Sequence, residues 1–158
     1  GLGRPVFAVT STLALVVLGT VSVNDHMQES AGVEMKDRNF YGTLRVFAFA
    51  ENGYRSMLHG QIVHGRQFLA PERAMEPTTY YNADAGAGLA INTQMTQGPV
   101  RVGVIGLGVG TLATYGRPED TYRFYEIDPL VIGMAQNNFS FLSKTLANTS
   151  LSSWVTLA

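Results

Sequence analysis

The chain has 158 residues, 46% of them hydrophobic and 15% charged, which is the composition of one folded domain with at most a small appendage. Its formal net charge is −1 and it has no dense basic cluster, so the sequence disfavours nucleic-acid binding. It has no cysteine, and its histidines (His26, His59, His64) lack a metal-site spacing with nearby carboxylates, so we expect neither disulfides nor a metal site.

The N-terminal segment Pro5–Val23 carries no charged residue and approaches the length of about 20 residues that a membrane-spanning helix needs. It is either the end of a transmembrane region, a buried helix or strand, or, least favoured, the core of a signal peptide. The polar segment Asn24–Arg38 predicts a linker. The chain begins without methionine and ends on Trp154–Ala158, a strand barely begun, so we expect it to be an excerpt of a longer protein.

Two β-rich runs follow, Asn39–Ala50 and Tyr54–Leu69. Asn52-Gly53 lies between them and predicts a hairpin, because both residues tolerate positive φ. After a loop over residues 71–79, Tyr80 opens a short helix that its glycines weaken. Residues 39–98 are therefore predicted to form a β-hairpin region with a substrate-side loop.

The C-terminal part, residues 99–158, has a β-α-β pattern. The apolar run Val100–Ile105 is typical of a strand in a parallel sheet, and a glycine-rich turn with a short helix follows it. Tyr122–Ile127 predicts the second strand, and Pro129–Phe139 a helix with Asp128 as its N-cap. A third strand begins at Trp154.

The turn after the first of these strands is typical of nucleoside binding. Gly106, Gly108 and Gly110 let the backbone turn sharply and bring its N–H groups close to a ligand. Glu126 ends the next strand, where its carboxylate can accept both hydroxyls of an adenosine ribose. Thr111 stands where the dinucleotide fingerprint has glycine or alanine, which favours S-adenosylmethionine over a dinucleotide.

The motifs LHGQIVHGRQ, PTTYY, VIGLGVGTLA and YEIDPLVIGMA together resemble the spermidine synthase family, the polyamine aminopropyltransferases, over about Asn39–Ala158. With RNFYG, the chain looks closest to members fused behind transmembrane segments. The resemblance implies an α/β fold, with an N-terminal β-hairpin region followed by a truncated doubly wound Rossmann-like sheet of the class I methyltransferase type. It also implies a cytoplasmic catalytic domain, membrane attachment through residues 5–23, and a homodimer as one assembly.

The resemblance further implies roles for single residues in transferring an aminopropyl group from decarboxylated S-adenosylmethionine to an amine such as putrescine, without a metal. The cofactor side would consist of Gly106, Gly108, Gly110, Glu126 and Asp128. The substrate side would consist of Gln67 (or Gln61), Tyr80 and Tyr81, with Tyr80 as a catalytic candidate. The general base is expected beyond Ala158, so the excerpt alone is expected to be inactive.

Departures from the family pattern keep other functions open. The family's G-G-G-D-G-G is Gly-Leu-Gly-Val-Gly-Thr here, so Val109 replaces an aspartate expected to face the positive end of the ligand. His59 and His64 stand where the family has an aspartate before glycine. They are either catalytic bases or polar residues of the hairpin. The alternatives are a methyltransferase that uses S-adenosylmethionine and a non-catalytic nucleoside-binding domain of a membrane protein.

Overall fold

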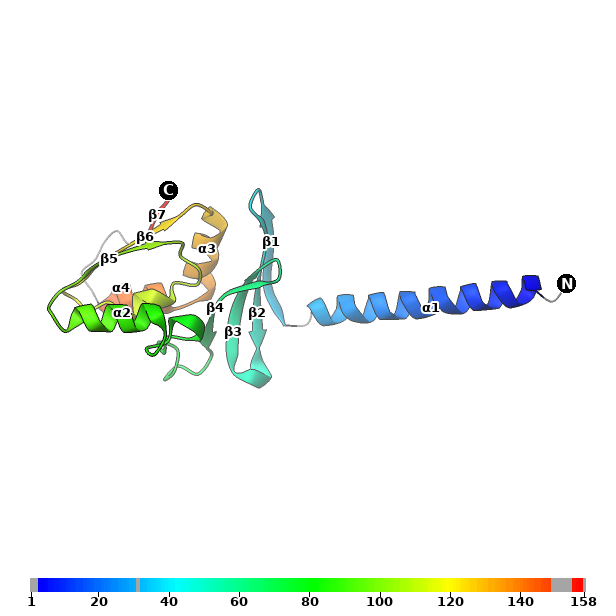
Figure 1. Cartoon of the computed structure of the whole chain (residues 1–158), viewed down its shortest axis with the longest axis horizontal. Coiled ribbons are helices and arrows are strands. Elements are labelled where there is room, and N and C mark those ends of the chain that lie inside the picture. Colours follow the sequence, from blue (N-terminus) through cyan, green and yellow to red (C-terminus); the bar gives the residue numbers. More distant parts are fainter. Residues whose placement is uncertain (1–2, 31, 149–154, 158) are drawn as a thin grey trace. The chain divides into compact units, whose positions relative to one another are not determined.

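The computed structural model describes residues 3–30, 32–148 and 155–157, with side chains for residues 8–24 and 32–145. It divides the chain into two compact units, Gly1–Val33 and Glu34–Ala158, which are described separately. The fold is mixed α/β: an N-terminal helix, an antiparallel meander of four strands, and a small parallel sheet with helices (Figure 1).

The first unit contains the helix α1 (Gly3–Ser30). Its apolar side chains between Val9 and Val23 are exposed, and the segment forms a helix, so the strand alternative is wrong. Among the helices for which the structure gives residues, none has the length and apolarity needed to cross a bilayer. The side chains of Pro5, Val6 and Phe7 lie outside the described part.

The meander consists of β1 (Val33–Asn39), β2 (Gly42–Phe49), β3 (Tyr54–His59) and β4 (Ile62–Phe68), in that order across the sheet. The predicted hairpin at Asn52-Gly53 is confirmed: β2 and β3 pair antiparallel, and Gly53 has φ +68°. Between them stands the 3₁₀ helix η1 (Ala50–Asn52). The run Tyr54–Leu69 is two strands rather than one, because the chain turns at Gly60, which has φ +59°.

The segment Asn24–Arg38, predicted as a linker, contains regular secondary structure. Its first residues continue α1 to Ser30, and its last residues lie in β1. No glycine or proline interrupts residues 24–30, so the helix can propagate. The charges of β1 face solvent, as is common for a strand at the edge of a sheet.

The parallel sheet contains β5 (Arg101–Ile105), β6 (Thr121–Glu126) and β7 (Val155–Leu157), and it confirms the predicted β-α-β pattern. The third strand is present as β7, whereas Trp154 lies outside the described residues. The helix expected after the glycine turn is a 3₁₀ helix, η3 (Thr111–Tyr115). The helices α3 (Pro129–Asn138) and α4 (Phe141–Asn148) follow β6.

The helix expected to open at Tyr80 begins later. A 3₁₀ helix, η2 (Thr79–Tyr81), comes first, and α2 (Gly86–Met95) follows it. The side chain of Asn82 accepts a hydrogen bond from the backbone N–H of Asp84 at 3.0 Å, which forms a local turn in place of a helical one.

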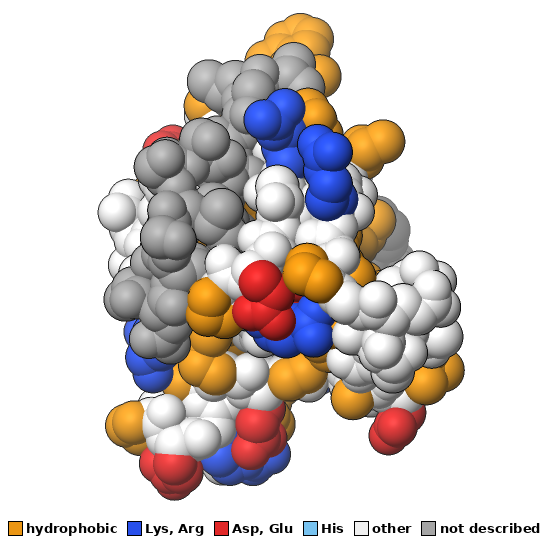
Figure 2. All heavy atoms as spheres, turned by 90° about the vertical axis from the view of Figure 1, so that its left-hand side faces the viewer, with side chains coloured by type: hydrophobic (Ala, Val, Ile, Leu, Met, Phe, Trp, Pro, Cys, Tyr) orange, Lys and Arg blue, Asp and Glu red, His pale blue; other side chains and the backbone are white. Residues whose placement is uncertain are grey.

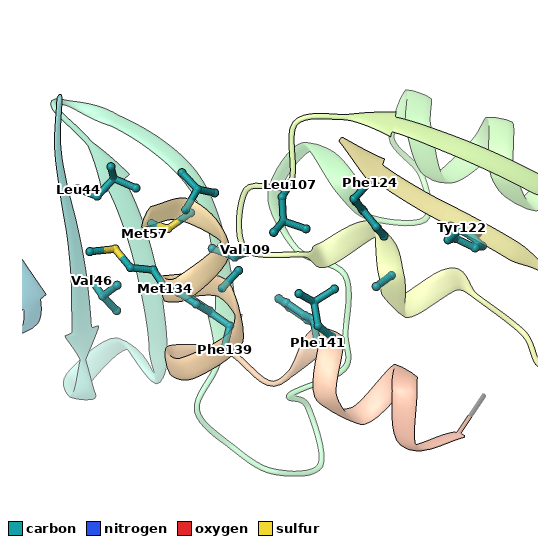
Figure 3. Close-up of a cluster of buried hydrophobic side chains, with 14 residues drawn as sticks. Leu44, Val46, Met57, Leu107, Val109, Tyr122, Phe124, Met134, Phe139 and Phe141 are labelled. Atoms are coloured by element: carbon teal, nitrogen blue, oxygen red, sulfur yellow. The ribbon is translucent and has the colours of Figure 1, made fainter. Parts of the chain in front are cut away.

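The meander and the parallel sheet share one hydrophobic core. Figure 3 shows Leu44, Val46 and Met57 of the meander near Met134 and Phe139, with Val109 between the two layers. On β6 the side chains alternate: Tyr122, Phe124 and Glu126 are buried, and those between them are exposed. Within the described residues only one face of this sheet is covered, so the doubly wound arrangement remains a prediction.

The charged side chains are dispersed over the face of the molecule that Figure 2 shows. On the face that Figure 2 shows, basic side chains lie in separate groups, with acidic side chains beside some of them and hydrophobic side chains between. Two ion pairs of the described surface, Arg73–Glu76 and Arg117–Glu119, join neighbours in sequence.

A buried carboxylate supports the entry to β6 and leads to a prediction on stability. Asp120 is 1% exposed and accepts hydrogen bonds from the Arg117 guanidinium and from the backbone N–H groups of Val100 and Arg117. These bonds, first of all those from the Arg117 side chain, lower its pKa from 3.8 to about 2. The carboxylate therefore stabilises the fold fully above pH 3.8, and this contribution is lost as the pH falls towards 2.

We expect Asp120→Asn to lower the free energy of unfolding at pH 7 by about 2 kcal/mol relative to the unmodified chain. The difference should shrink as the pH falls towards 2, because the native side chain is then protonated as well. Urea denaturation of both proteins between pH 7 and pH 2 measures it. A difference that stays constant over this range would show that the ionised carboxylate has no such role.

Candidate functional site

The carboxyl ends of β5 and β6 are tied together by Glu126. This side chain is 8% exposed; its Oε2 accepts a hydrogen bond from the backbone N–H of Leu107 at 2.8 Å, and its Oε1 accepts one from that of Asp128 at 3.0 Å. Each carboxylate oxygen has further acceptor capacity after these bonds. The predicted strand-end acid therefore lies directly beside the predicted glycine turn.

A hollow of about 370 Å³ opens at this edge of the sheet. Two groups of residues line it, one from the parallel sheet and its connections and one from the meander and the loop after it. The first group consists of Ile105, Gly106, Gly108, Glu126, Ile127, Asp128 and Val131. The second group consists of Tyr41, His59, His64 and Tyr81. We refer to this hollow as the strand-end pocket.

The glycines of the turn differ in what surrounds them. A Cβ added to Gly106 would meet no atom within 4 Å, so the backbone here borders open space. A Cβ at Gly108 would lie 2.7 Å from the carbonyl oxygen of His64, and the φ of Gly108 is +56°. Gly110 contacts Leu142 and is not part of the pocket lining. Gly106 and Gly108 both border the pocket, and Gly108 is also needed for the close approach of β4.

Asp128 confirms the predicted N-cap of α3. Its Oδ1 accepts a hydrogen bond from the backbone N–H of Leu130 at 2.8 Å and another from the side-chain amide of Asn39 on β1. Its Oδ2 is buried and has no hydrogen-bond partner in the described part of the chain. The residue thus caps a helix, contacts the meander and borders the pocket.

Two histidines from neighbouring strands face the pocket from the meander. Their ring centroids are 5.6 Å apart, and Nε2 of His59 lies 2.7 Å from the carbonyl oxygen of Tyr41. Burial lowers the pKa of His64 below 6.5, and the electrostatic effect of neighbouring His59 acts in the same direction, while Glu126 opposes both. His64 is therefore a neutral imidazole at pH 7.

The predicted substrate-side residues are only partly brought together. Tyr81 lines the pocket, and burial raises the pKa of its phenol, so it is a neutral hydroxyl group near neutral pH. Tyr80 packs against it with the rings tilted by 50° and their centroids 4.3 Å apart, but Tyr80 is 57% exposed and does not line the pocket. Gln67 is buried away from the pocket. Its side-chain nitrogen donates to the carbonyl of Ala74 at 2.9 Å and to the hydroxyl of Ser140, and its side-chain oxygen accepts a hydrogen bond from the backbone N–H of Ser140. Gln61 lies in the exposed turn between β3 and β4.

The expectation that position 109 faces the ligand is wrong. Val109 is 1% exposed and lies in the core, where a Cβ on Gly65 of β4 would overlap its methyl groups. The apolar side chain at this position is explained by packing between the turn and the meander. An aspartate in the same orientation would be buried among apolar groups, which costs free energy.

Sequence reasoning missed Tyr41 as a pocket residue, although it lies in the RNFYG motif that contributed to the resemblance. It also missed the apolar side chains Ile105, Ile127 and Val131. The positions of Ile105 and Ile127 could have been predicted, since residues at the carboxyl ends of parallel strands border the crevice there. The position of Tyr41 in the pocket depends on how the meander packs against the parallel sheet, and no local sequence pattern indicates that packing.

The lining of the pocket defines what it can hold. It includes the carboxylates of Glu126 and Asp128 and no lysine or arginine, so its charge suits a neutral or cationic ligand better than a phosphate. Among the described residues, no group of three or more histidine, aspartate or glutamate side chains could hold a metal ion. Comparison with protein-family models, with curated proteins and with solved structures finds no match for the chain.

Proposed function

We propose that residues 34–158 bind an adenosine compound with a sulfonium group in the strand-end pocket and act as a spermidine synthase-like aminopropyltransferase domain. The observation that carries the proposal is the position of Glu126, at the end of β6 beside the glycine turn and bordering open space at Gly106. There the carboxylate can accept the two ribose hydroxyls while it still binds the N–H groups of Leu107 and Asp128. A cytoplasmic location for the domain is a prediction that rests on the resemblance alone.

Two observations favour a sulfonium compound over a dinucleotide. In dinucleotide-binding proteins, the pyrophosphate binds at the N-terminus of the α-helix that follows the glycine turn. Here the turn leads into η3, a 3₁₀ helix of five residues, whose dipole is correspondingly small. In addition, none of the lining residues is a lysine or an arginine, whereas Tyr41 and Tyr81 bring aromatic rings to the lining, a residue type that suits a cation.

The proposed reaction is a nucleophilic displacement. A primary amine attacks the methylene carbon that is bonded to the positive sulfur; the nitrogen–carbon bond forms, the carbon–sulfur bond breaks, and sulfur keeps the electron pair. The leaving group is then a neutral thioether nucleoside. Because the amine is protonated near neutral pH, a group in the protein must take its proton before the attack.

Methyl transfer from S-adenosylmethionine is the second candidate, and the lack of an acidic residue between Gly106 and Thr111 favours it. Decarboxylated S-adenosylmethionine ends in an ammonium group that an acidic residue on the turn would neutralise, and Val109 supplies none. The carboxylate of S-adenosylmethionine needs backbone N–H groups instead, which the glycine turn can provide.

Calorimetric titration of the full-length protein separates these candidates. We expect decarboxylated S-adenosylmethionine or S-adenosylmethionine to bind at least tenfold more tightly than NAD, a difference of about 1.4 kcal/mol. Tighter binding of NAD than of both sulfonium compounds would overturn the proposal.

Turnover with putrescine then distinguishes the reactions. Formation of spermidine from the decarboxylated compound supports aminopropyl transfer, and a methylated product from S-adenosylmethionine supports the second candidate. Binding of a sulfonium compound without transfer to any amine would leave a non-catalytic nucleoside-binding domain.

A further inference from the structure

The resemblance places the general base beyond Ala158, yet the strand-end pocket contains a group suited to that task. His64 lines the pocket together with Gly106 and Glu126, the two residues that the proposed function assigns to the nucleoside. Its backbone carbonyl is in close approach to Gly108, so β4 is fixed against the glycine turn. The imidazole is therefore held at a defined place relative to any ligand on the turn.

The surroundings of His64 keep it able to accept a proton. Its ring lies beside that of His59, whose Nε2 is 2.7 Å from the Tyr41 carbonyl. The other titratable groups that line the same pocket are Glu126, Asp128, Tyr41 and Tyr81. Of these, the Glu126 carboxylate raises the pKa of His64, which burial and His59 lower. The imidazole is thus neutral at pH 7, while the Glu126 carboxylate stabilises the imidazolium that forms when it accepts a proton.

We propose that His64 is the catalytic residue that accepts the proton of the attacking amine, with His59 as the residue that adjusts its basicity. This proposal rests on the proposed transfer function. The bound ammonium group gives one proton to the free ring nitrogen of His64, and the neutral amine then displaces the thioether as described above. The product leaves as a secondary ammonium ion, and the imidazolium returns its proton to water.

The pH dependence of transfer tests this role in the full-length protein. The neutral imidazole is present above the pKa of His64 and is lost as the pH falls through it, so kcat/KM should fall on the acidic side, below pH 6.5. His64→Gln should lower kcat at pH 7.5 about 100-fold, as removal of a general base does. Its rate should rise with pH towards the pKa of the free amine near 10, since the amine must then lose its proton unaided.

The matched control is His59→Gln, which changes the neighbouring imidazole in the same pocket. It removes a charge that lowers the pKa of His64, so we expect the acidic fall of kcat/KM to move to higher pH and remain present. Nucleoside binding by His64→Gln, measured by calorimetry, reports that the variant is folded. His64→Ala with added imidazole provides a second readout, because a free base should restore part of the rate.

The outcomes separate this proposal from the proposed function. The proposal is supported if the rate of His64→Gln rises steadily towards pH 10 in place of the fall below pH 6.5, and if that fall moves to higher pH in His59→Gln. If His64→Gln keeps both the acidic fall and a rate within about threefold of the unmodified protein, His64 is not the proton acceptor although the transfer function stands. If the unmodified protein binds the nucleoside but transfers nothing to any amine, the transfer function and the role of His64 are both overturned.

Discussion

Glu126→Gln is expected to weaken the binding of every adenosine ligand by about 100-fold, or roughly 3 kcal/mol. The carboxylate accepts the ribose hydroxyls through charge-assisted hydrogen bonds, and an amide has one acceptor oxygen and no charge. The amide nitrogen would also face one of the N–H groups that the carboxylate now binds, those of Leu107 and Asp128. Calorimetric titration with S-adenosylmethionine measures the change.

Glu119→Gln is the matched control for this experiment. It removes the same charge from a side chain that is 49% exposed, pairs with Arg117 and does not line the strand-end pocket. Its ligand affinity should equal that of the unmodified protein. Equal affinity in Glu126→Gln, with the fold intact by circular dichroism, would remove Glu126 from the ribose site.

Gly65→Ala is expected to lower the free energy of unfolding by about 3 kcal/mol, because backbone strain and overpacking add up at this position. Gly65 has φ +146°, a conformation that residues with a side chain rarely adopt. An added methyl group would also overlap the side chain of Val109, which is fully surrounded by core residues. Urea denaturation at neutral pH measures the loss.

Gly60→Ala separates strain from overpacking. Gly60 has φ +59°, and an added Cβ would meet no atom within 4 Å, so the substitution costs only the left-handed conformation, about 1 kcal/mol. A loss in Gly65→Ala no larger than that in Gly60→Ala would show that the meander and the glycine turn are not tightly packed. Because His64 precedes Gly65, the same packing fixes the imidazole in the pocket.

The features that the sequence predicts correctly have local physical causes. The hairpin at Asn52-Gly53 follows from the tolerance of Gly53 for positive φ, and the N-cap at Asp128 from its side-chain oxygen. The adjacency of Glu126 and Gly106 follows from the parallel β-α-β unit, which brings the ends of successive strands to one edge.

The features that the sequence does not predict depend on contacts between distant segments. Burial of Val109 requires β4 to lie against the glycine turn, and Gly65 allows this although the two residues are far apart in the chain. Tyr41 enters the pocket only because the meander docks there. Gln67 forms its bonds with Ala74 and Ser140, and no spacing rule relates these three positions.

The central claim is that the glycine turn and Glu126 together hold the sugar of an adenosine compound. A crystal structure of the protein with S-adenosylmethionine tests it most directly. Our account predicts that both ribose hydroxyls lie about 2.7 Å from the Glu126 carboxylate oxygens, with the sulfonium end directed towards His64. A nucleoside bound at another place, with the strand-end pocket empty, would contradict it.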